Sequence, residues 1–197
     1  MIRFALTGGI ACGKSFLGSV LSGLGVEVVD ADEVVRALHA PGGKAALAVR
    51  ESFGPAYLGP DGATDRKRLG DLVFADESAR RRLEALLHPL VRQHILDWKS
   101  APGAAAFRCA QIPLLFESGW EGDWDATVTV ESPMPLRLER LAARGLSHEE
   151  ALRRIAAQLP EETRRARADF VVENDADRDT LRRRAEDLLK QLRNLGT

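Results

Sequence analysis

The chain has 197 residues, of which 45% are hydrophobic and 29% are charged, and its formal net charge is −1. This length and composition predict one folded domain with insertions and exclude a long disordered chain. A net charge near zero also excludes the overall basic field of many nucleic-acid-binding proteins, so we expect no nucleic-acid partner and anion binding only by local basic clusters.

No run of apolar residues approaches the roughly 18 residues of a membrane-spanning helix, so we expect no membrane segment. The apolar residues at the N-terminus run directly into a glycine-rich loop, which argues against a cleavable signal peptide. The two cysteines, Cys12 and Cys109, are far apart and lack the spacing of metal ligands. Together these features predict free thiols and a cytoplasmic protein.

Five short apolar runs alternate with helical patterns along the chain. The runs predict buried strands at residues 2–6, 26–29, 107–112, 126–130 and 170–172. The helical patterns cover residues 14–24, 80–99, 133–144, 147–158 and 179–192. This alternation predicts an α/β fold with a five-stranded, mostly parallel sheet that helices cover on both faces.

Two helices carry sharp signals at their starts. Ser132 offers an N-cap, with Pro133 at the first helical position. Ser147 and Glu150 form a capping box for the next helix. Residues 54–76, by contrast, are rich in glycine, proline and charge and follow no strand period, so they predict either a loop or a small inserted lobe.

The last predicted helix is amphipathic. Its apolar residues fall on one face and are Leu181, Ala185, Leu188, Leu189 and Leu192. The opposite face is rich in arginine. We expect this helix to dock on the core and its arginine face to be solvated rather than functional.

The segment after the first predicted strand fits the phosphate-binding pattern G-x-x-x-x-G-K-[ST] at every specified position. Glycines let backbone amides point at phosphate oxygens, and the following helix adds its positive N-terminal end. The lysine reaches the β- and γ-phosphates, and the serine hydroxyl binds Mg²⁺. The predicted nucleotide-binding residues are Gly8, Gly9, Ile10, Ala11, Cys12, Gly13, Lys14, Ser15 and Phe16, with Ser15 as the metal ligand. A chance glycine-rich turn is the alternative, and the strand–loop–helix context disfavours it.

A regulatory GTPase is disfavoured, because no aspartate has glycine three positions later and no Asn-Lys-x-Asp motif occurs. A small-molecule kinase needs a carboxylate near the acceptor hydroxyl. The second predicted strand ends in Asp30-Ala31-Asp32, at the sheet edge where open α/β folds bind ligands. Either aspartate suits the role of base or magnesium partner, and a helix N-cap is the alternative for Asp32. Another apolar strand runs into Glu117, which predicts the rim of a pocket.

Residues 131–170 contain eight arginines and no lysine. Arg153 and Arg154 each have a glutamate four positions earlier, which explains them as helix-stabilising pairs. Arg140 and Arg144 have no acid three or four positions away and predict a binding site for an external anion. A helical hairpin with such residues suits a lid over a nucleotide, while a solvated basic face is the alternative.

Together these segments resemble the dephospho-CoA kinase family over residues 3–174. The similar segments include the phosphate loop, Asp30-Ala31-Asp32, His88-Pro89, and residues 113–117, 140–144 and 154–158. Their order and spacing also agree with the family. The phosphate loop alone is typical of a much larger superfamily, whereas the combination is specific.

The resemblance implies one kinase domain in three parts. The core is expected at residues 1–59, 96–136 and 166–197, a helical substrate lobe at about 60–95 and a helical lid at about 137–165. It implies transfer of the γ-phosphate of ATP to the 3′-hydroxyl of dephospho-CoA, with Mg²⁺ as cofactor. ATP and dephospho-CoA are then the partners of a monomer or weak homo-oligomer.

The resemblance also implies residue roles. Asp32 would act as the base that orients the acceptor hydroxyl, Lys14 would hold the transferring phosphoryl group, and Arg140 would close over the phosphates. The expected acceptor-binding residues are Asp32, Arg66, Phe74, His88 and Glu117, although a helix cap ahead of Pro89 explains His88 equally well. Two alternatives stay open: another small-metabolite or nucleoside kinase on the same core, and a nucleotide-gated module that binds ATP without transferring phosphate.

Overall fold

The computed structural model describes residues 1–195. Its strands are β1 (Ile2–Thr7), β2 (Glu27–Asp30), β3 (Phe107–Gln111), β4 (Ala126–Glu131) and β5 (Phe170–Glu173). Its helices are α1 (Lys14–Gly23), α2 (Ala31–Leu38), α3 (Lys44–Phe53), α4 (Arg66–Ala75), α5 (Glu77–Ser100), α6 (Met134–Ala142), α7 (His148–Ala156), α8 (Glu161–Arg167) and α9 (Arg178–Asn194). The chain divides into two compact units, which are residues 1–29 with the chain from residue 103 onward, and residues 30–102.

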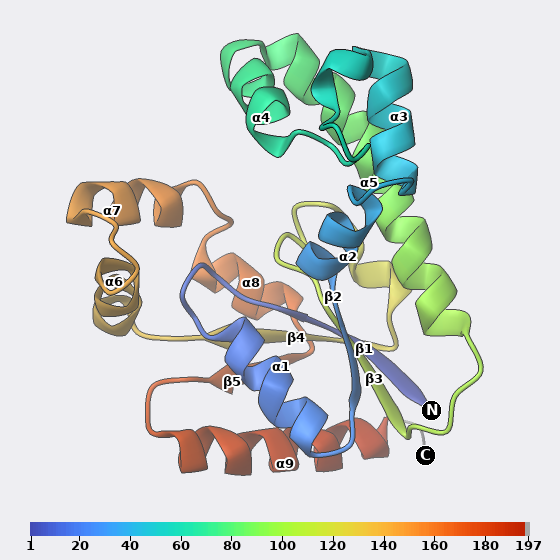
Figure 1. Cartoon of the computed structure of the whole chain (residues 1–197). Coiled ribbons are helices and arrows are strands. Elements are labelled where there is room, and N and C mark those ends of the chain that lie inside the picture. Colours follow the sequence, from blue (N-terminus) through green and yellow to red (C-terminus); the bar gives the residue numbers. More distant parts are fainter. Residues whose placement is uncertain (196–197) are drawn as a thin grey trace. The chain divides into compact units, whose positions relative to one another are not determined.

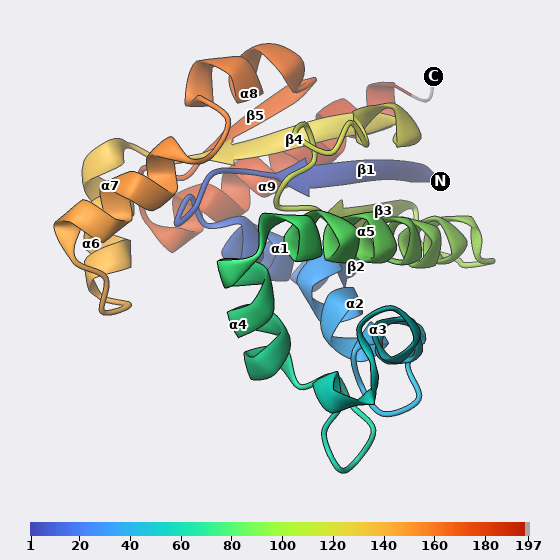
Figure 2. The same ribbon diagram turned by 90° about the horizontal axis from the view of Figure 1, so that it is seen from above.

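The first unit is built on a sheet with the strand order β2-β3-β1-β4-β5 (Figure 1). β1 pairs in parallel with both β3 and β4, and β4 pairs in parallel with β5. Figure 2 shows β1 lying between β3 and β4. Parallel strands bring their carboxyl ends to one edge of the sheet, where open α/β folds bind ligands. The predicted α/β fold with a five-stranded, mostly parallel sheet is therefore confirmed.

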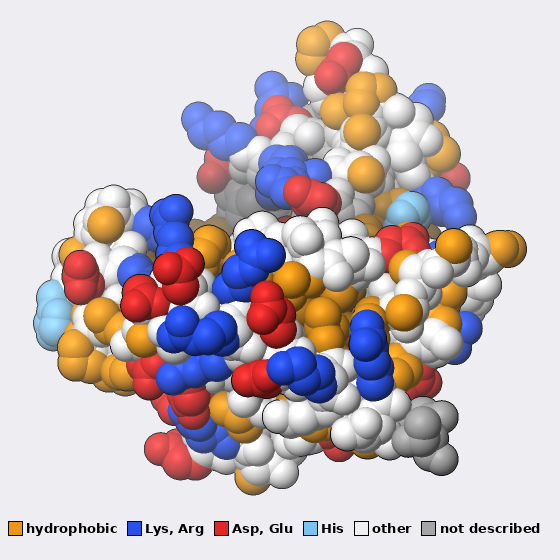
Figure 3. Space-filling view, turned by 90° about the horizontal axis from the view of Figure 1, so that it is seen from below, with side chains coloured by type: hydrophobic (Ala, Val, Ile, Leu, Met, Phe, Trp, Pro, Cys, Tyr) orange, Lys and Arg blue, Asp and Glu red, His pale blue; other side chains and the backbone are white. Residues whose placement is uncertain are grey.

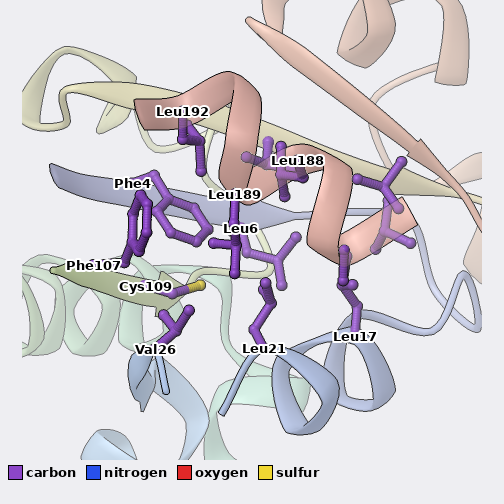
Figure 4. Packing of buried hydrophobic residues seen from close by; sticks show 14 of the residues in the cluster. Phe4, Leu6, Leu17, Leu21, Val26, Phe107, Cys109, Leu188, Leu189 and Leu192 are labelled. Carbon is purple, nitrogen blue, oxygen red and sulfur yellow. The ribbon is translucent and has the colours of Figure 1, made fainter. Parts of the chain in front are cut away.

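The core of this unit lies between the sheet and the helices α1 and α9 (Figure 4). Leu17 and Leu21 of α1 and Leu188 of α9 pack with Phe4 and Leu6 of β1, and all five side chains are buried. Burial of each such side chain contributes about 1.5–3 kcal/mol. The buried residues of α9 are Leu181, Ala185, Leu188, Leu189 and Leu192. They form the face that the sequence predicted.

The outer side of α9 is charged and solvated. Arg182 pairs with Glu186 at 3.3 Å, and Lys190 pairs with Asp187 at 2.8 Å, and all four side chains are largely exposed. Figure 3 shows the molecule from below, relative to the view in Figure 1, and α9 lies on that side. Basic and acidic side chains lie next to one another there. The prediction of a docked helix with a solvated arginine face is confirmed. Within residues 1–195, no helix combines the length and the apolar character needed to cross a bilayer.

The second unit, residues 30–102, is helical. α2, α4 and α5 each begin after an aspartate whose side chain accepts a backbone N–H of the first turn: Asp30, Asp65 and Asp76. The cap of α2 is thus Asp30 and not Asp32, so the alternative explanation of Asp32 as an N-cap is wrong. Similarly, His88 lies inside α5, so it does not cap a helix ahead of Pro89.

Several helices were not predicted from the sequence. α2, α3, α4 and α8 have between 7 and 10 residues, so few apolar positions define a face in each of them. α5 begins at Glu77, three residues before its predicted start, because Asp76 caps it. Residues 54–76 contain α4, which favours a small helical lobe over a plain loop for this stretch. Ser147, in contrast, caps α7 as predicted and accepts the Glu150 N–H at 3.2 Å.

Candidate active site

The loop between β1 and α1 has the backbone of an anion-binding site. α1 begins at Lys14 after Gly13, so the N–H groups of its first turn have no acceptor within the helix. Ala11 has φ 62° and Gly13 has φ 99°, and left-handed residues within such a loop turn successive N–H groups toward one concave side. A side chain at position 13 would be strained and would collide with the amide of Asn174. The loop therefore presents backbone amides and the positive end of α1 to an anion.

Two arginines of α6 hold backbone carbonyl groups of this loop. Arg137 Nε donates to the carbonyl oxygen of Ile10 at 3.0 Å, and Arg140 Nη1 donates to that of Ala11 at 2.9 Å. The peptide units are trans, so the N–H of each unit points away from the arginine that holds its carbonyl. Arg137 thus turns the Ala11 N–H away from its own guanidinium, while the N–H of the unit held by Arg140, that of Cys12, donates to the Gly9 carbonyl oxygen at 3.1 Å.

The next carbonyl of the loop is held from the ends of β4 and β5. Asn174 Nδ2 donates to the carbonyl oxygen of Cys12 at 2.8 Å, and Ser132 Oγ lies 3.0 Å from the same oxygen. Ser132 Oγ is also 2.6 Å from the Asn174 carbonyl oxygen. The prediction that Ser132 caps the following helix is wrong, because α6 starts at Met134 and the hydroxyl is turned to the loop. The backbone at Pro133, not the Ser132 side chain, precedes that helix.

Arg140 has more protein partners than its sequence context indicated. Its Nη1 also lies 2.9 Å from Ser132 Oγ, and its Nη2 lies 3.4 Å from the carbonyl oxygen of Asn174. Arg140 therefore also holds the loop and the end of β5, a role that the sequence did not indicate. The spacing of acids on its own helix cannot show acceptors that other segments bring. Its contact with a nucleotide stays a prediction, as does that of Arg144, which is exposed.

Glu131, at the carboxyl end of β4, forms a buried ion pair with Arg164 of α8. Arg164 Nε lies 2.8 Å from Glu131 Oε1 and Nη2 lies 2.7 Å from Oε2, and the two side chains are 4% and 0% exposed. Burial by itself lowers the pKa of Arg164, but the hydrogen bonds and charge of Glu131 outweigh burial and raise that pKa. Arg164 also donates to the carbonyl of Leu159. The pair therefore ties the start of α8 to the sheet.

We expect Arg164→Ala to lower the free energy of unfolding by about 3–5 kcal/mol, because it leaves the Glu131 carboxylate buried without its partner. Urea denaturation of wild type and variant measures this difference. Arg182→Ala is the matched control, since its pair with Glu186 lies on the exposed side of α9 and should contribute at most about 1 kcal/mol. An equally small decrease in the free energy of unfolding of both variants would contradict a stabilising role of the buried pair.

Both cysteines are buried, as Cys12 and Cys109 are each 0% exposed. Burial, followed by the nearby charge of Glu131, raises the pKa of Cys12 to about 11, and burial raises the pKa of Cys109 further. The reactive thiolate is therefore scarce near neutral pH. We expect the thiol reagent DTNB to modify neither cysteine in the native protein and both after unfolding in guanidinium chloride. Fast modification of one thiol in the native protein would contradict this.

A pocket of about 280 Å³ opens beside the phosphate loop. Its lining residues are Ala11, Gly13, Phe16, Arg140, Arg144, Asn174, Ala176, Asp177 and Arg178. The Arg178 guanidinium lies 5.4 Å from the centroid of the Phe16 ring, a cation–π arrangement, and Phe16 is 36% exposed. An aromatic ring and planar guanidinium groups suit a flat aromatic ligand. The loop thus lies beside a pocket whose Phe16 and Arg178 side chains are chemically suited to a planar ring.

The residues predicted to contact an acceptor are divided between the two units. Asp32, Arg66, Phe74 and His88 belong to the helical unit and are exposed there, and Phe74 is 95% exposed. Glu117 belongs to the first unit, where its Oε1 accepts the Leu159 N–H at 3.2 Å. Glu117 therefore has a partner in the chain leading into α8. The acceptor-binding roles of all five stay predictions.

Several residues that contact the loop had no predicted role. Besides Arg137 and Asn174, Gln158 is one of them, because its Oε1 accepts the N–H of Ile10 at 2.6 Å. A signal for Arg137 was present: it precedes Leu141 by four residues, so both lie on the buried face of α6. Gln158 and Asn174 lie within the region that resembles the family, but no helix or strand pattern indicates their contacts, because those contacts form only after the strands have paired.

The chain is similar to known proteins over nearly its whole length. A family model described as dephospho-CoA kinase matches residues 2–180. The dephospho-CoA kinase of Anaeromyxobacter dehalogenans is 47% identical, over 95% of this chain and 90% of that protein. The solved structure of TT1252 from Thermus thermophilus is 38% identical, with a TM-score of 0.80 and 97% of each chain covered. The solved dephospho-CoA kinase from Campylobacter jejuni is 29% identical, with a TM-score of 0.72 and coverage of 99% and 98%.

Proposed function

The chain belongs to the dephospho-CoA kinase family, and from this membership we propose that it transfers the γ-phosphate of ATP to the 3′-hydroxyl of dephospho-CoA, giving coenzyme A and ADP. The observation that carries the proposal is the family match over residues 2–180 together with an intact phosphate loop. The loop geometry supports binding of a polyphosphate by backbone amides and Lys14. Family membership supports dephospho-CoA as the acceptor.

Mg²⁺ is the proposed cofactor, and the residues present fit it. Ser15 is exposed in the first turn of α1, directly after Lys14. Its hydroxyl and the phosphate oxygens of ATP are the hard oxygen ligands that Mg²⁺ prefers. When bound, the ion neutralises charge on the β- and γ-phosphates. Lys14 and the loop amides then hold the same oxygens from the protein side.

We place the adenine ring in the pocket beside the loop. Phe16 and Arg178 supply a ring face and a guanidinium plane for stacking, which supports a purine there. Arg140 and Arg144 line the same pocket, which supports contact with the nucleotide phosphates. Binding of ATP would thus involve both helix α6 and the loop.

Asp32 is the proposed base for the acceptor. It lies in the first turn of α2 and is exposed, so its carboxylate is open to a ligand. In the proposed step, Asp32 accepts the proton of the 3′-hydroxyl while that oxygen bonds to the γ-phosphorus. The bond from phosphorus to the β–γ bridging oxygen breaks, and ADP leaves. Positioning and charge neutralisation carry the catalysis. Arg66, Phe74, His88 and Glu117 are the proposed acceptor contacts.

An acceptor panel tests the proposed function. The purified protein is incubated with Mg·ATP and dephospho-CoA, adenosine, shikimate or gluconate, and ADP release is followed by a coupled assay. We expect dephospho-CoA to be used at least about 100-fold faster than the other acceptors. Faster turnover of another acceptor would support a different small-metabolite kinase. ATP binding without any phosphorylated product in a single-turnover experiment would support a non-catalytic nucleotide-gated module.

The cytoplasm is the proposed location, which the free, buried thiols support. A monomer or weak homo-oligomer is the proposed state in solution. Size-exclusion chromatography with light scattering checks it, and a stable higher oligomer would contradict it.

A further inference from the structure

Two guanidinium groups converge on the α-carbon of Gly9 in the phosphate loop. A β-carbon at position 9 would lie 2.8 Å from Arg137 Nη2 and 2.8 Å from Arg164 Nη2. Both arginines are only 3% exposed. Glycine at this position therefore leaves room for two buried guanidinium groups, one from α6 and one from α8, that contact the loop.

Among residues 1–195, only one of these two guanidinium groups is paired with a carboxylate. Glu131 accepts two hydrogen bonds from Arg164, at 2.8 and 2.7 Å. Arg137 makes one hydrogen bond, from Nε to the carbonyl oxygen of Ile10. Its Nη2 is buried and has no hydrogen-bond partner among residues 1–195, and the same part of the chain forms no salt bridge to it. Arg137, Arg164 and Glu131 together therefore carry one excess positive charge next to the loop.

A buried charge without a counter-charge is unfavourable, and an anion nearby would offset it. The loop that Arg137 holds is also the part of the chain built to receive an anion. The bond to the Ile10 carbonyl turns the N–H of the same peptide unit, that of Ala11, away from Arg137. Arg137 thus combines an orienting hydrogen bond with an uncompensated charge.

We propose that Arg137 is a positioning residue whose buried charge, acting through the loop, strengthens the binding of the nucleotide polyphosphate. The inference deepens the proposed function and rests on its nucleotide site, but not on the identity of the acceptor. The effect is electrostatic, so it grows with the charge of the ligand. ATP, which carries about one more negative charge than ADP, responds more strongly than ADP.

The test compares Arg137→Gln, which can still donate to the Ile10 carbonyl but is neutral, with Arg137→Lys, which keeps the charge. Dissociation constants of Mg·ATP and Mg·ADP are measured by calorimetry. We expect Arg137→Gln to weaken ATP binding by about tenfold and ADP binding by about threefold, and Arg137→Lys to stay within about threefold of wild type for both. Arg153→Gln, at an exposed position of α7, is the matched control and should bind both nucleotides as wild type does.

Three results would overturn the proposal. One is unchanged ATP binding by Arg137→Gln, and another is an equal loss of ATP and ADP binding, which indicates damage to the loop rather than loss of charge. The third is a tenfold loss of ATP affinity in Arg137→Lys, because lysine keeps the positive charge. This result would refute the proposal even if Arg137→Gln does not fold. A wild-type protein that binds ATP but leaves dephospho-CoA unphosphorylated would instead refute the proposed acceptor and leave these binding comparisons valid.

Discussion

Lys14→Ala is expected to lower kcat/KM for ATP by about 10³-fold, equivalent to roughly 4 kcal/mol of transition-state stabilisation. Lys14 is the first residue of α1, directly after the loop, where the amides and the helix end already favour an anion. Lys14 adds a full, mobile positive charge to the oxygens of the transferring phosphoryl group. We therefore expect loss of both ATP affinity and turnover.

Calorimetric titration with Mg·ATP and the coupled ADP assay measure the two effects of Lys14→Ala separately. Lys190→Ala is the matched control, because Lys190 is exposed on α9 and pairs with Asp187 there. The control should keep wild-type affinity and turnover. Wild-type activity in Lys14→Ala would overturn the assignment of the phosphate loop.

Asp32→Asn is expected to lower kcat by about 10²–10⁴-fold while ATP affinity stays within about threefold of wild type. Asparagine has nearly the same shape as aspartate but accepts no proton from the 3′-hydroxyl. Asp32 is exposed in the first turn of α2 and does not cap the helix. A loss of activity would therefore reflect missing chemistry and not a missing cap.

Asp30→Asn distinguishes the role of Asp30 from that of Asp32, the two aspartates at the end of β2. Asp30 Oδ1 accepts the Asp32 N–H at 2.8 Å, and an asparagine at position 30 can still cap α2. If Asp32 is the base, Asp30→Asn should retain much more turnover than Asp32→Asn. Glu33→Gln, at the next exposed acid of the same helix, controls for a general loss of negative charge. A turnover of Asp32→Asn within a few-fold of wild type would remove Asp32 from the role of base.

Much of the fold could be predicted from the sequence because its signals are local. The phosphate loop depends on eight consecutive residues between a strand and a helix, so contiguous chain carries the whole pattern. The buried face of α9 follows from a periodicity of 3.6 residues over a long helix. The short helices α2 and α4 were not predicted from their sequence pattern, because two or three apolar positions do not distinguish a helix from a loop.

The partners of the loop were decided by the tertiary structure. Arg137 bonds to a carbonyl 127 positions away in the sequence, and Asn174 bonds to one 162 positions away. Such contacts exist only because β1 lies beside β4, β4 lies beside β5, and parallel pairing brings their carboxyl ends to one edge.

The sequence by itself therefore determined that this chain has a phosphate loop and the alternating strands and helices of an α/β fold, because the loop pattern and each apolar run lie in neighbouring residues. Only the tertiary structure decided that Arg140 holds a loop carbonyl, that Glu131 neutralises Arg164, and that Arg137 is left with its charge unbalanced. Hydrogen bonds and ion pairs depend on distances of a few ångströms between side chains. For residues far apart in the chain, strand order and packing set those distances, and local spacing does not.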